Sequence, residues 1–175
     1  MSWTVMAIIT LVLGGIKSGK SKTGMNCIEQ ITDQPCIIAT ARRTDGEMGQ
    51  RIDQHIAERG EHWQCIEAPL ALADALTASQ GPVLVDCLGT WVTNLLIEQP
   101  DQLQAEIDKL LSALIQRTDD TVLISNESGL GVIGIDKITR QFVDQLGLLN
   151  QAIASHAQRV CFCVAGIENW LKDTD

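Results

Sequence analysis

The sequence is poor in positive charge: 13 Lys and Arg residues stand against 22 Asp and Glu residues and leave a net charge of −9. A phosphate backbone or an anionic membrane surface would favour a basic face, so we expect neither nucleic acid nor membrane as a partner. The apolar run near the N-terminus, residues 7–13, is too short to span a bilayer and has no basic residue before it. We therefore expect no signal peptide, no anchor and no membrane insertion.

The sequence also lacks the cysteine patterns of disulfide frameworks and zinc sites. Its six cysteines form no C-x-x-C pair and no Cys/His cluster with zinc spacing. They lie mostly within apolar segments, at positions 27, 36, 65, 87, 161 and 163. This distribution predicts buried thiols in the reducing cytosol, and hence a cytoplasmic protein.

No internal repeat, low-complexity tract or linker divides the 175 residues, so we expect a single domain, residues 1–175. Short apolar segments alternate with helical patterns, which is typical of an α/β fold with a mostly parallel sheet covered by helices on both faces. The expected strands are residues 7–13, 36–40, 63–67, 83–88, 121–125 and 159–165. The expected helices are residues 20–31, 45–59, 70–79, 90–98, 102–117 and 136–156, and the glycine-rich residues 129–134 should form a surface loop.

A glycine-rich segment follows the first expected strand. Residues 14–21 match G-x-x-x-x-G-K-S without a mismatch, in the order Gly14, Gly15, Ile16, Lys17, Ser18, Gly19, Lys20 and Ser21. In a phosphate-binding loop of this kind, backbone N–H groups and the next helix N-terminus surround phosphate oxygens. Lys20 would reach the β- and γ-phosphates, and the Ser21 hydroxyl would bind Mg²⁺. The strand–loop–helix order favours nucleoside triphosphate binding over a glycine-rich turn that binds nothing.

An acidic residue, Asp86, ends the apolar segment 83–85. In P-loop enzymes a carboxylate at the tip of a neighbouring strand orients Mg²⁺, whereas an isolated Asp at this place can equally form a turn or cap a helix. Together with the loop at 14–21, the pattern predicts that Asp86 and Ser21 serve the metal. Residues 86–89 also match the D-x-x-G of regulatory GTPases, but the sequence has no N-K-x-D guanine motif, which disfavours a switch GTPase.

His55 is the histidine of chemical interest. It lies in the polar helical stretch 45–59, after the second expected strand, where a P-loop fold places groups near the nucleotide. A neutral imidazole can act as a covalent nucleophile or as a general base, although the local sequence also suits an ordinary surface histidine. His62 and His156 have the character of structural residues.

Five blocks of sequence occur in the order found in a known enzyme family. The first is the loop at 14–21, with Lys17 where the family usually has Arg. The second joins Ile-Ala-Thr-Ala at 38–41 to residues 45–55, which match D-x-E-M-x-x-R-I-x-x-H. The other three blocks are residues 85–96, 125–131 and 140–151. Over almost its whole length the chain thus resembles the bifunctional adenosylcobinamide kinase/adenosylcobinamide-phosphate guanylyltransferases of cobalamin nucleotide-loop assembly.

This resemblance implies a RecA-like, three-layer P-loop fold, a homotrimer, Mg²⁺ as cofactor, and ATP and GTP as substrates. It implies that a γ-phosphoryl group is first transferred to the aminopropanol hydroxyl of adenosylcobinamide. It further implies that His55 attacks the α-phosphorus of GTP and passes GMP to adenosylcobinamide phosphate. Lys20 would be the second catalytic residue, and Thr40, Glu67 and Asp86 would join the loop in binding the nucleotide.

The chain departs from the family pattern at Gly60, Ser128, Gly134 and the pair Glu168–Asn169. None of these positions coincides with Lys20, Asp86 or His55, so we expect the chemistry to survive, while greater loop freedom could alter contacts to the corrinoid. Two alternatives stay open at the level of sequence. One is another small-molecule P-loop kinase in which His55 is incidental, and the other is a non-catalytic nucleotide-binding or switch module.

Overall fold

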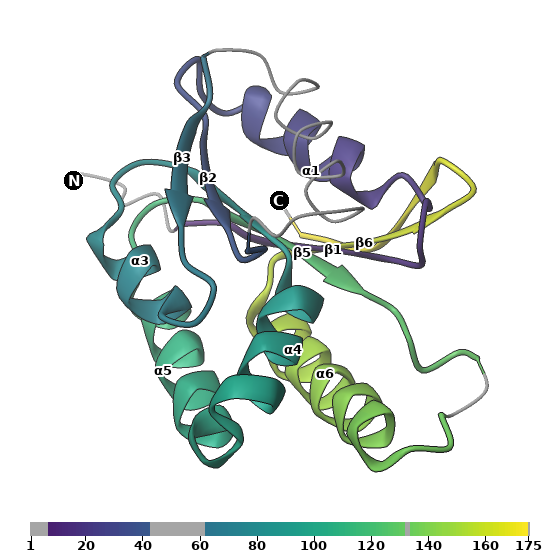
Figure 1. Cartoon of the computed structure of the whole chain (residues 1–175). Coiled ribbons are helices and arrows are strands. Elements are labelled where there is room, and N and C mark those ends of the chain that lie inside the picture. Colours follow the sequence, from purple (N-terminus) through teal and green to yellow (C-terminus); the bar gives the residue numbers. More distant parts are fainter. Residues whose placement is uncertain (1–6, 43–61, 132–133, 175) are drawn as a thin grey trace.

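The computed structural model of the chain, which describes residues 7–42, 62–131 and 134–174, is built around a seven-stranded sheet (Figure 1). The strands stand in the order β3-β2-β4-β5-β1-β6-β7, with β7 antiparallel to β6 and the other pairs parallel. Their bounds are β1 Ile9–Gly14, β2 Cys36–Ala39, β3 Gln64–Glu67, β4 Val83–Asp86, β5 Thr121–Asn126, β6 Arg159–Val164 and β7 Ile167–Asp173. The central strands are continuous apolar runs because helices cover both of their faces.

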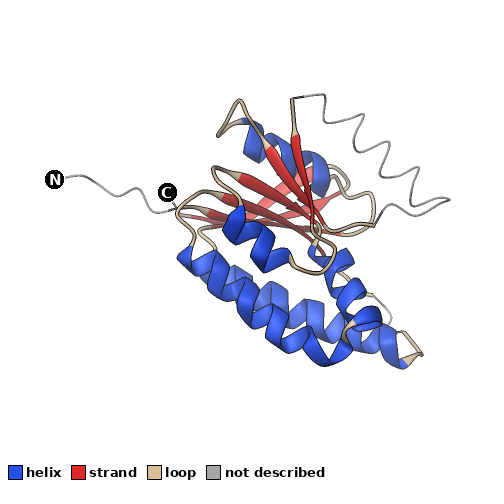
Figure 2. Cartoon of the chain, turned by 60° about the vertical axis from the view of Figure 1, so that its left-hand side comes forward, coloured by secondary structure: helices blue, strands red, loops and turns tan. Residues whose placement is uncertain are grey.

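The helices form the two outer layers. Helix α1 (Lys20–Glu29) lies on one face, whereas α3 (Leu72–Ala78), α4 (Leu88–Glu98), α5 (Leu103–Gln116) and α6 (Lys137–His156) lie on the other (Figure 2). A short 3₁₀-helix, Pro100–Gln102, joins α4 to α5. The predicted three-layer α/β architecture is confirmed. In the described ranges no helix is both long and apolar enough to cross a membrane.

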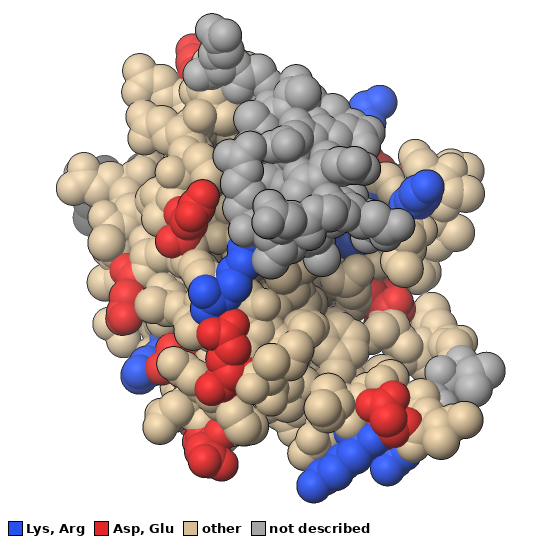
Figure 3. Space-filling model, viewed as in Figure 1, with Lys and Arg blue, Asp and Glu red and all other residues tan. Residues whose placement is uncertain are grey.

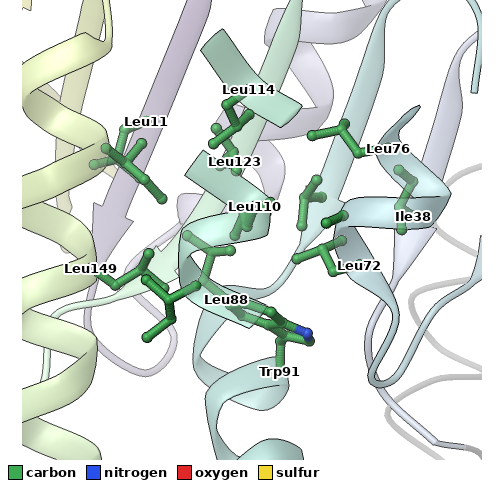
Figure 4. Close-up of a cluster of buried hydrophobic side chains, with 14 of the residues drawn as sticks. Leu11, Ile38, Leu72, Leu76, Leu88, Trp91, Leu110, Leu114, Leu123 and Leu149 are labelled. Carbon is green, nitrogen blue, oxygen red and sulfur yellow. The ribbon is translucent and has the colours of Figure 1, made fainter. Parts of the chain in front are cut away.

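Two apolar clusters fill the spaces between these layers. Neighbouring residues of a strand point to opposite faces, so Leu11 packs toward the four-helix side and Val12 toward α1. The larger cluster is centred on fully buried leucines and on Trp91, whose indole Nε1 donates to the carbonyl oxygen of Leu70 at 2.8 Å (Figure 4). Because both clusters use the same strands, the sheet ties the two sides of the molecule together.

Several expected boundaries differ from the observed ones. The segment expected as strand 83–88 leaves the sheet at Asp86, since Cys87 is the N-cap of α4 and Leu88 is already helical. Strand β7 was not expected, and Cys65 is exposed rather than buried. The helix expected over 45–59 lies outside the described residues. The other expected strands and helices are confirmed to within a few residues at each end.

Candidate active site

The carboxyl ends of the parallel strands bring most of the predicted residues to one edge of the sheet. Gly14 ends β1 opposite Asn126 of β5, and Asp86 ends β4 opposite Ala39 of β2. Thr40 follows β2 directly. Ligands of open α/β sheets bind at this edge, where loops leave the strands. The strand order therefore assembles a site from segments that are far apart in the sequence.

The loop between β1 and α1 has the backbone of a close-fitting phosphate cradle. Gly19 has a φ of 99° and Lys17 a φ of 55°, and α1 begins directly afterwards at Lys20. A Cβ on Gly14 would lie 2.2 Å from Ser18 Oγ, so the loop closes over itself only because this residue is glycine. The N–H groups of such a loop and of the following helix N-terminus form an anion-binding concavity.

Three side chains of the loop fit this use. Lys20 Nζ donates to the carbonyl oxygen of Gly15 at 3.0 Å, which holds the ammonium group against the loop. Ser18 Oγ is buried and has no hydrogen-bond partner among the described residues, so it is free to donate to a phosphate oxygen. Ser21 is half-buried in the first turn of α1. In contrast, Ile16 and Lys17 are exposed, Ile16 with 85% of its surface.

The β6–β7 hairpin fixes the far side of the loop. Its turn consists of Ala165 and Gly166, both with positive φ, and the Gly166 N–H donates to the Ser18 carbonyl oxygen at 2.9 Å. Thr23 Oγ1 of α1 donates to Glu168 Oε1 of β7 at 2.9 Å. The turn comes so close that a Cβ on Gly19 would lie 3.1 Å from Gly166 Cα. Neither this contact nor β7 was expected from the sequence. The sequence feature that indicates the hairpin is the two-residue Ala-Gly turn between the apolar residues Val164 and Ile167.

Thr40 shapes the tip of strand β4. Its side chain is fully buried, and its hydroxyl accepts from the Cys87 N–H at 2.9 Å and lies 2.8 Å from the Cys87 carbonyl oxygen. Asn94 Nδ2 donates to the Thr40 carbonyl oxygen at 2.9 Å. Thr40 thereby holds the backbone from Asp86 to Cys87, where the peptide bond is cis. Its predicted contact with the nucleotide remains a prediction.

Burial, with the nearby Asp86 carboxylate as the next contribution, raises the pKa of the Cys87 thiol. A thiol with a raised pKa stays protonated and is a poor nucleophile.

Asp86 is half-buried at the end of β4, and two strand intervals separate β4 from β1 in the order β4-β5-β1. That separation is about 10 Å at the usual spacing of strands, close enough for a carboxylate and Ser21 to serve one hydrated ion.

Glu67 lies apart from the loop. It is an exposed residue at the end of β3, and four strand intervals separate β3 from β1. At the usual spacing this amounts to about 19 Å, so Glu67 does not approach phosphates held by residues 14–21. Any contact between Glu67 and a nucleotide held by the loop involves another part of that nucleotide. The nucleotide-binding role of Glu67 stays a prediction.

A hollow of about 550 Å³ opens beside the loop. The described part of its lining comes from the loop, α4, the end of β5 with the segment that follows, and α6. These lining residues are Ile16, Gly89, Thr90, Thr93, Asn126, Glu127, Ser128, Gly131 and Phe142. In the sequence, residues 125–131 stand out only as one of the five family blocks. Their place in the lining of the hollow follows from the position of Asn126 and Glu127 at the end of β5, beside β1. That position depends on the strand order.

The predicted nucleophile, His55, lies outside the described residues. His62 is exposed, with its Nε2 4.0 Å from Glu29 Oε1, and His156 is exposed at the end of α6. On the face drawn in Figure 3, the described Lys and Arg side chains are scattered among Asp and Glu. The described residues contain no group of three or more His, Cys, Asp and Glu side chains arranged to hold a metal ion.

The comparison with protein families shows to which family the chain belongs. The family described as "Cobinamide kinase / cobinamide phosphate guanyltransferase" matches residues 10–171. The chain belongs to this family. Two relatives of the cobinamide kinase/guanyltransferase family are named bifunctional adenosylcobalamin biosynthesis proteins. CobP of Pseudomonas aeruginosa PAO1 is 43% identical over an alignment of 166 residues that covers 93% of this chain and 96% of the relative. CobU of Escherichia coli K12 is 34% identical and covers 91% of this chain and 97% of the relative.

A solved structure from Pyrococcus horikoshii OT3 matches the fold alone, with a TM-score of 0.59 at 9% identity over 96% of this chain and 87% of the other. Membership of the cobinamide kinase/guanyltransferase family confirms the resemblance, the P-loop fold and the bifunctional assignment as adenosylcobinamide kinase and adenosylcobinamide-phosphate guanylyltransferase. Family membership also rules out the two alternatives, which were another small-molecule P-loop kinase and a non-catalytic switch module. The substrates that the site has to accommodate are therefore nucleotides and cobinamides.

Proposed function

We propose that residues 14–21 bind the triphosphate for both reactions, that Ser21 and Asp86 hold Mg²⁺, and that His55 carries GMP between GTP and the corrinoid. The observation that supports this most directly is the loop itself. It combines a tight glycine-dependent backbone, a lysine held against it and a buried hydroxyl, Ser18 Oγ, that has no partner among the described residues. A phosphate oxygen would satisfy that hydroxyl.

The residues at the strand edge fit Mg²⁺ as a cofactor. Mg²⁺ usually keeps several waters and is held by one or two protein groups together with substrate phosphates. Ser21 and Asp86 provide one hydroxyl and one carboxylate from neighbouring parts of the edge. When bound, Mg²⁺ would neutralise charge on the phosphate oxygens.

In the kinase step, the loop N–H groups and Lys20 orient the triphosphate and stabilise the charge that develops on the transferred group. The hydroxyl oxygen of the acceptor forms a bond to the γ-phosphorus. The bond from that phosphorus to the β–γ bridging oxygen breaks, and its electron pair leaves with the nucleoside diphosphate. We propose that ATP and GTP are both accepted in this step.

In the guanylyl step, a neutral His55 imidazole nitrogen forms a bond to the α-phosphorus of GTP, and pyrophosphate leaves. A phosphate oxygen of adenosylcobinamide phosphate then attacks the same phosphorus, which breaks the nitrogen–phosphorus bond and restores the imidazole. A covalent intermediate of this kind lets the bulky acceptor enter after pyrophosphate has left. We further propose a homotrimer and a cytoplasmic location, following the family resemblance and the cysteine content.

The deciding experiment is incubation with α-³²P-GTP and Mg²⁺, followed by peptide mapping of the labelled protein. We expect label on His55 only, in an adduct labile to acid and stable to base. His55→Ala should abolish the adduct and guanylyl transfer, whereas γ-phosphoryl transfer to adenosylcobinamide should persist because it needs no covalent enzyme intermediate. Labelling of the wild type should also fail at low pH, where the protonated ring has no lone pair for attack.

His62→Ala and His156→Ala are the matched controls, since both histidines are exposed in the described structure. Both variants should label as the wild type does. Label that maps to His62, His156 or Lys20 would contradict the assignment of His55. Loss of the kinase reaction in the His55→Ala protein would instead mean that the two chemistries share this residue.

A further inference from the structure

We propose that the hollow beside the loop receives the hydroxyl-bearing arm of the acceptor and that Glu127 accepts the proton of that hydroxyl during γ-phosphoryl transfer. The inference rests on the kinase half of the proposed function and names a catalytic residue for it. Neither the sequence motifs nor the family comparisons assign this role to Glu127.

The position of the hollow suits an acceptor site. Ile16 brings the phosphate-binding loop to its wall, and the Glu127 N–H donates to the Gly14 carbonyl oxygen at 3.1 Å. Glu127 is therefore attached through its backbone to the first residue of the loop. A group bound in the hollow lies next to the segment that would hold the phosphates, as an incoming nucleophile must.

The lining favours a neutral, hydroxylated ligand. Thr90, Thr93 and Asn126 offer hydroxyl and amide groups, whereas Ile16 and Phe142 offer apolar surface. Among the lining residues that the structure describes, none is Lys or Arg, so these residues offer no positive charge to a second phosphate. Its volume is that of a site for a drug-sized ligand, and a corrin ring with its side chains is larger than such a ligand. The hollow would thus take the arm and leave the macrocycle outside.

The Glu127 carboxylate is oriented for this role. Its Oε1 accepts from the Gly129 N–H at 2.7 Å, which fixes the plane of the group. Within the described part of the chain Oε2 has no hydrogen bond, so it can accept from a ligand. Of the described residues that line the hollow, Glu127 alone carries a charged side chain. A carboxylate that accepts the proton of a substrate hydroxyl is the usual base of phosphoryl transfer to alcohols.

The step balances without another reactant. As the hydroxyl oxygen bonds to the γ-phosphorus, the bond to the β–γ bridging oxygen breaks and the diphosphate leaves. The hydroxyl proton passes to Glu127 Oε2 and from there to water after product release. Proton transfer to a positioned side chain contributes on the order of 10²–10⁴-fold to a rate.

The test compares Glu127→Gln with the wild type in two assays on the full chain. The first measures transfer of ³²P from γ-labelled triphosphate to adenosylcobinamide, and the second measures labelling of the protein by α-³²P-GTP. The amide oxygen of Gln can still accept from the Gly129 N–H, so the loop should keep its shape. We expect kcat of the first reaction to fall about 10²–10⁴-fold, with the second reaction unchanged.

Two further variants complete the design. Glu106→Gln makes the same chemical change on α5, where Glu106 pairs with Lys109 at 2.5 Å, and should leave both assays unchanged. Ser128→Phe places a bulky group in the hollow from a loop residue and should raise the KM for adenosylcobinamide without preventing protein labelling. The thermal unfolding midpoint of each variant shows whether it has folded.

The outcomes separate this inference from the proposed function. A wild type that phosphorylates adenosylcobinamide, with an equally fast Glu127→Gln variant, would overturn the role of Glu127 alone. A Glu127→Gln variant that needs more Mg²⁺ in both assays would make Glu127 a metal ligand and also overturn it. A wild type that transfers no γ-phosphoryl group would overturn the kinase assignment and this inference together.

Discussion

Lys20 is the residue on which both reactions are expected to depend. Its ammonium group is held 3.0 Å from the Gly15 carbonyl oxygen and would bind a phosphate oxygen in the complex. A lost charge-assisted contact costs about 1.5–3 kcal/mol, which is roughly a 10- to 160-fold loss of affinity. Lys20→Ala should therefore weaken triphosphate binding by that factor, measured by titration of a fluorescent GTP analogue, and abolish both reactions.

The matched control is Lys22→Ala, which removes an exposed lysine from the same helix turn. It should bind and react as the wild type does, and both variants should unfold at nearly the wild-type temperature because neither lysine belongs to the core. Equal turnover by Lys20→Ala in the two assays would remove the loop lysine from the mechanism.

Asp86 offers a separate test at the metal. A neutral amide holds a hydrated dication less strongly than a carboxylate does, so Asp86→Asn should raise the Mg²⁺ concentration needed for half-maximal activity. The readout is an Mg²⁺ titration of the kinase reaction at saturating nucleotide, together with Mg²⁺-dependent nucleotide binding. Asp144→Asn, at an exposed position of α6, is the control. An unchanged titration for Asp86→Asn would make Asp86 a structural residue and leave the metal to another carboxylate.

At the scale of elements, the contact between the loop and the β6–β7 turn predicts different effects for two glycines. Both Gly19 and Gly166 have positive φ, which costs an L-residue about 1–2 kcal/mol. An added Cβ meets no described atom within 4 Å at Gly166, but at Gly19 it lies 3.1 Å from the turn. Gly166→Ala should therefore lower the free energy of unfolding by about 1–2 kcal/mol and leave triphosphate affinity unchanged. Gly19→Ala should lower both, because the turn must also move.

Gly147→Ala serves as the control for these two variants. Gly147 lies within α6, and an added Cβ there meets no described atom within 4 Å. Alanine is about 0.5–1 kcal/mol better than glycine inside a helix, so this variant should be more stable than the wild type. Equal triphosphate affinity for Gly19→Ala and Gly166→Ala would show that the turn does not hold the loop in its binding shape.

What the sequence could predict follows from how local each signal is. The loop was predictable because its glycines, Lys20 and Ser21 are contiguous and directly follow a buried strand. Strand β7 was not predictable, since Ile167–Asp173 is a mostly exposed edge strand whose side chains lack a clear apolar alternation. The distance of Glu67 from the loop and the closeness of Glu127 to it both depend on the strand order β3-β2-β4-β5-β1, which local patterns do not determine.

For the whole molecule, the central question is whether the three layers unfold as one unit. The larger cluster includes fully buried Leu110 of α5, and the smaller one includes fully buried Ile28 of α1. Adjacent residues of the same strands supply both clusters, as Leu11 and Val12 do in β1. Loss of packing on one face therefore removes support from the strands that the other face needs. This coupling predicts a single cooperative transition and a single domain.

Leu110→Ala and Ile28→Ala test this prediction from opposite faces. Each should lower the free energy of unfolding by about 2–5 kcal/mol, because each leaves a cavity in a closely packed cluster. The midpoint of the one transition should fall by about 2–4 °C for every kcal/mol lost. Calorimetry and far-UV circular dichroism should give the same midpoint for each variant, at several protein concentrations so that any dissociation of an oligomer is recognised. If Ile28→Ala instead splits the transition in two while Leu110→Ala shifts only one part, α1 and the four-helix side are separate folding units.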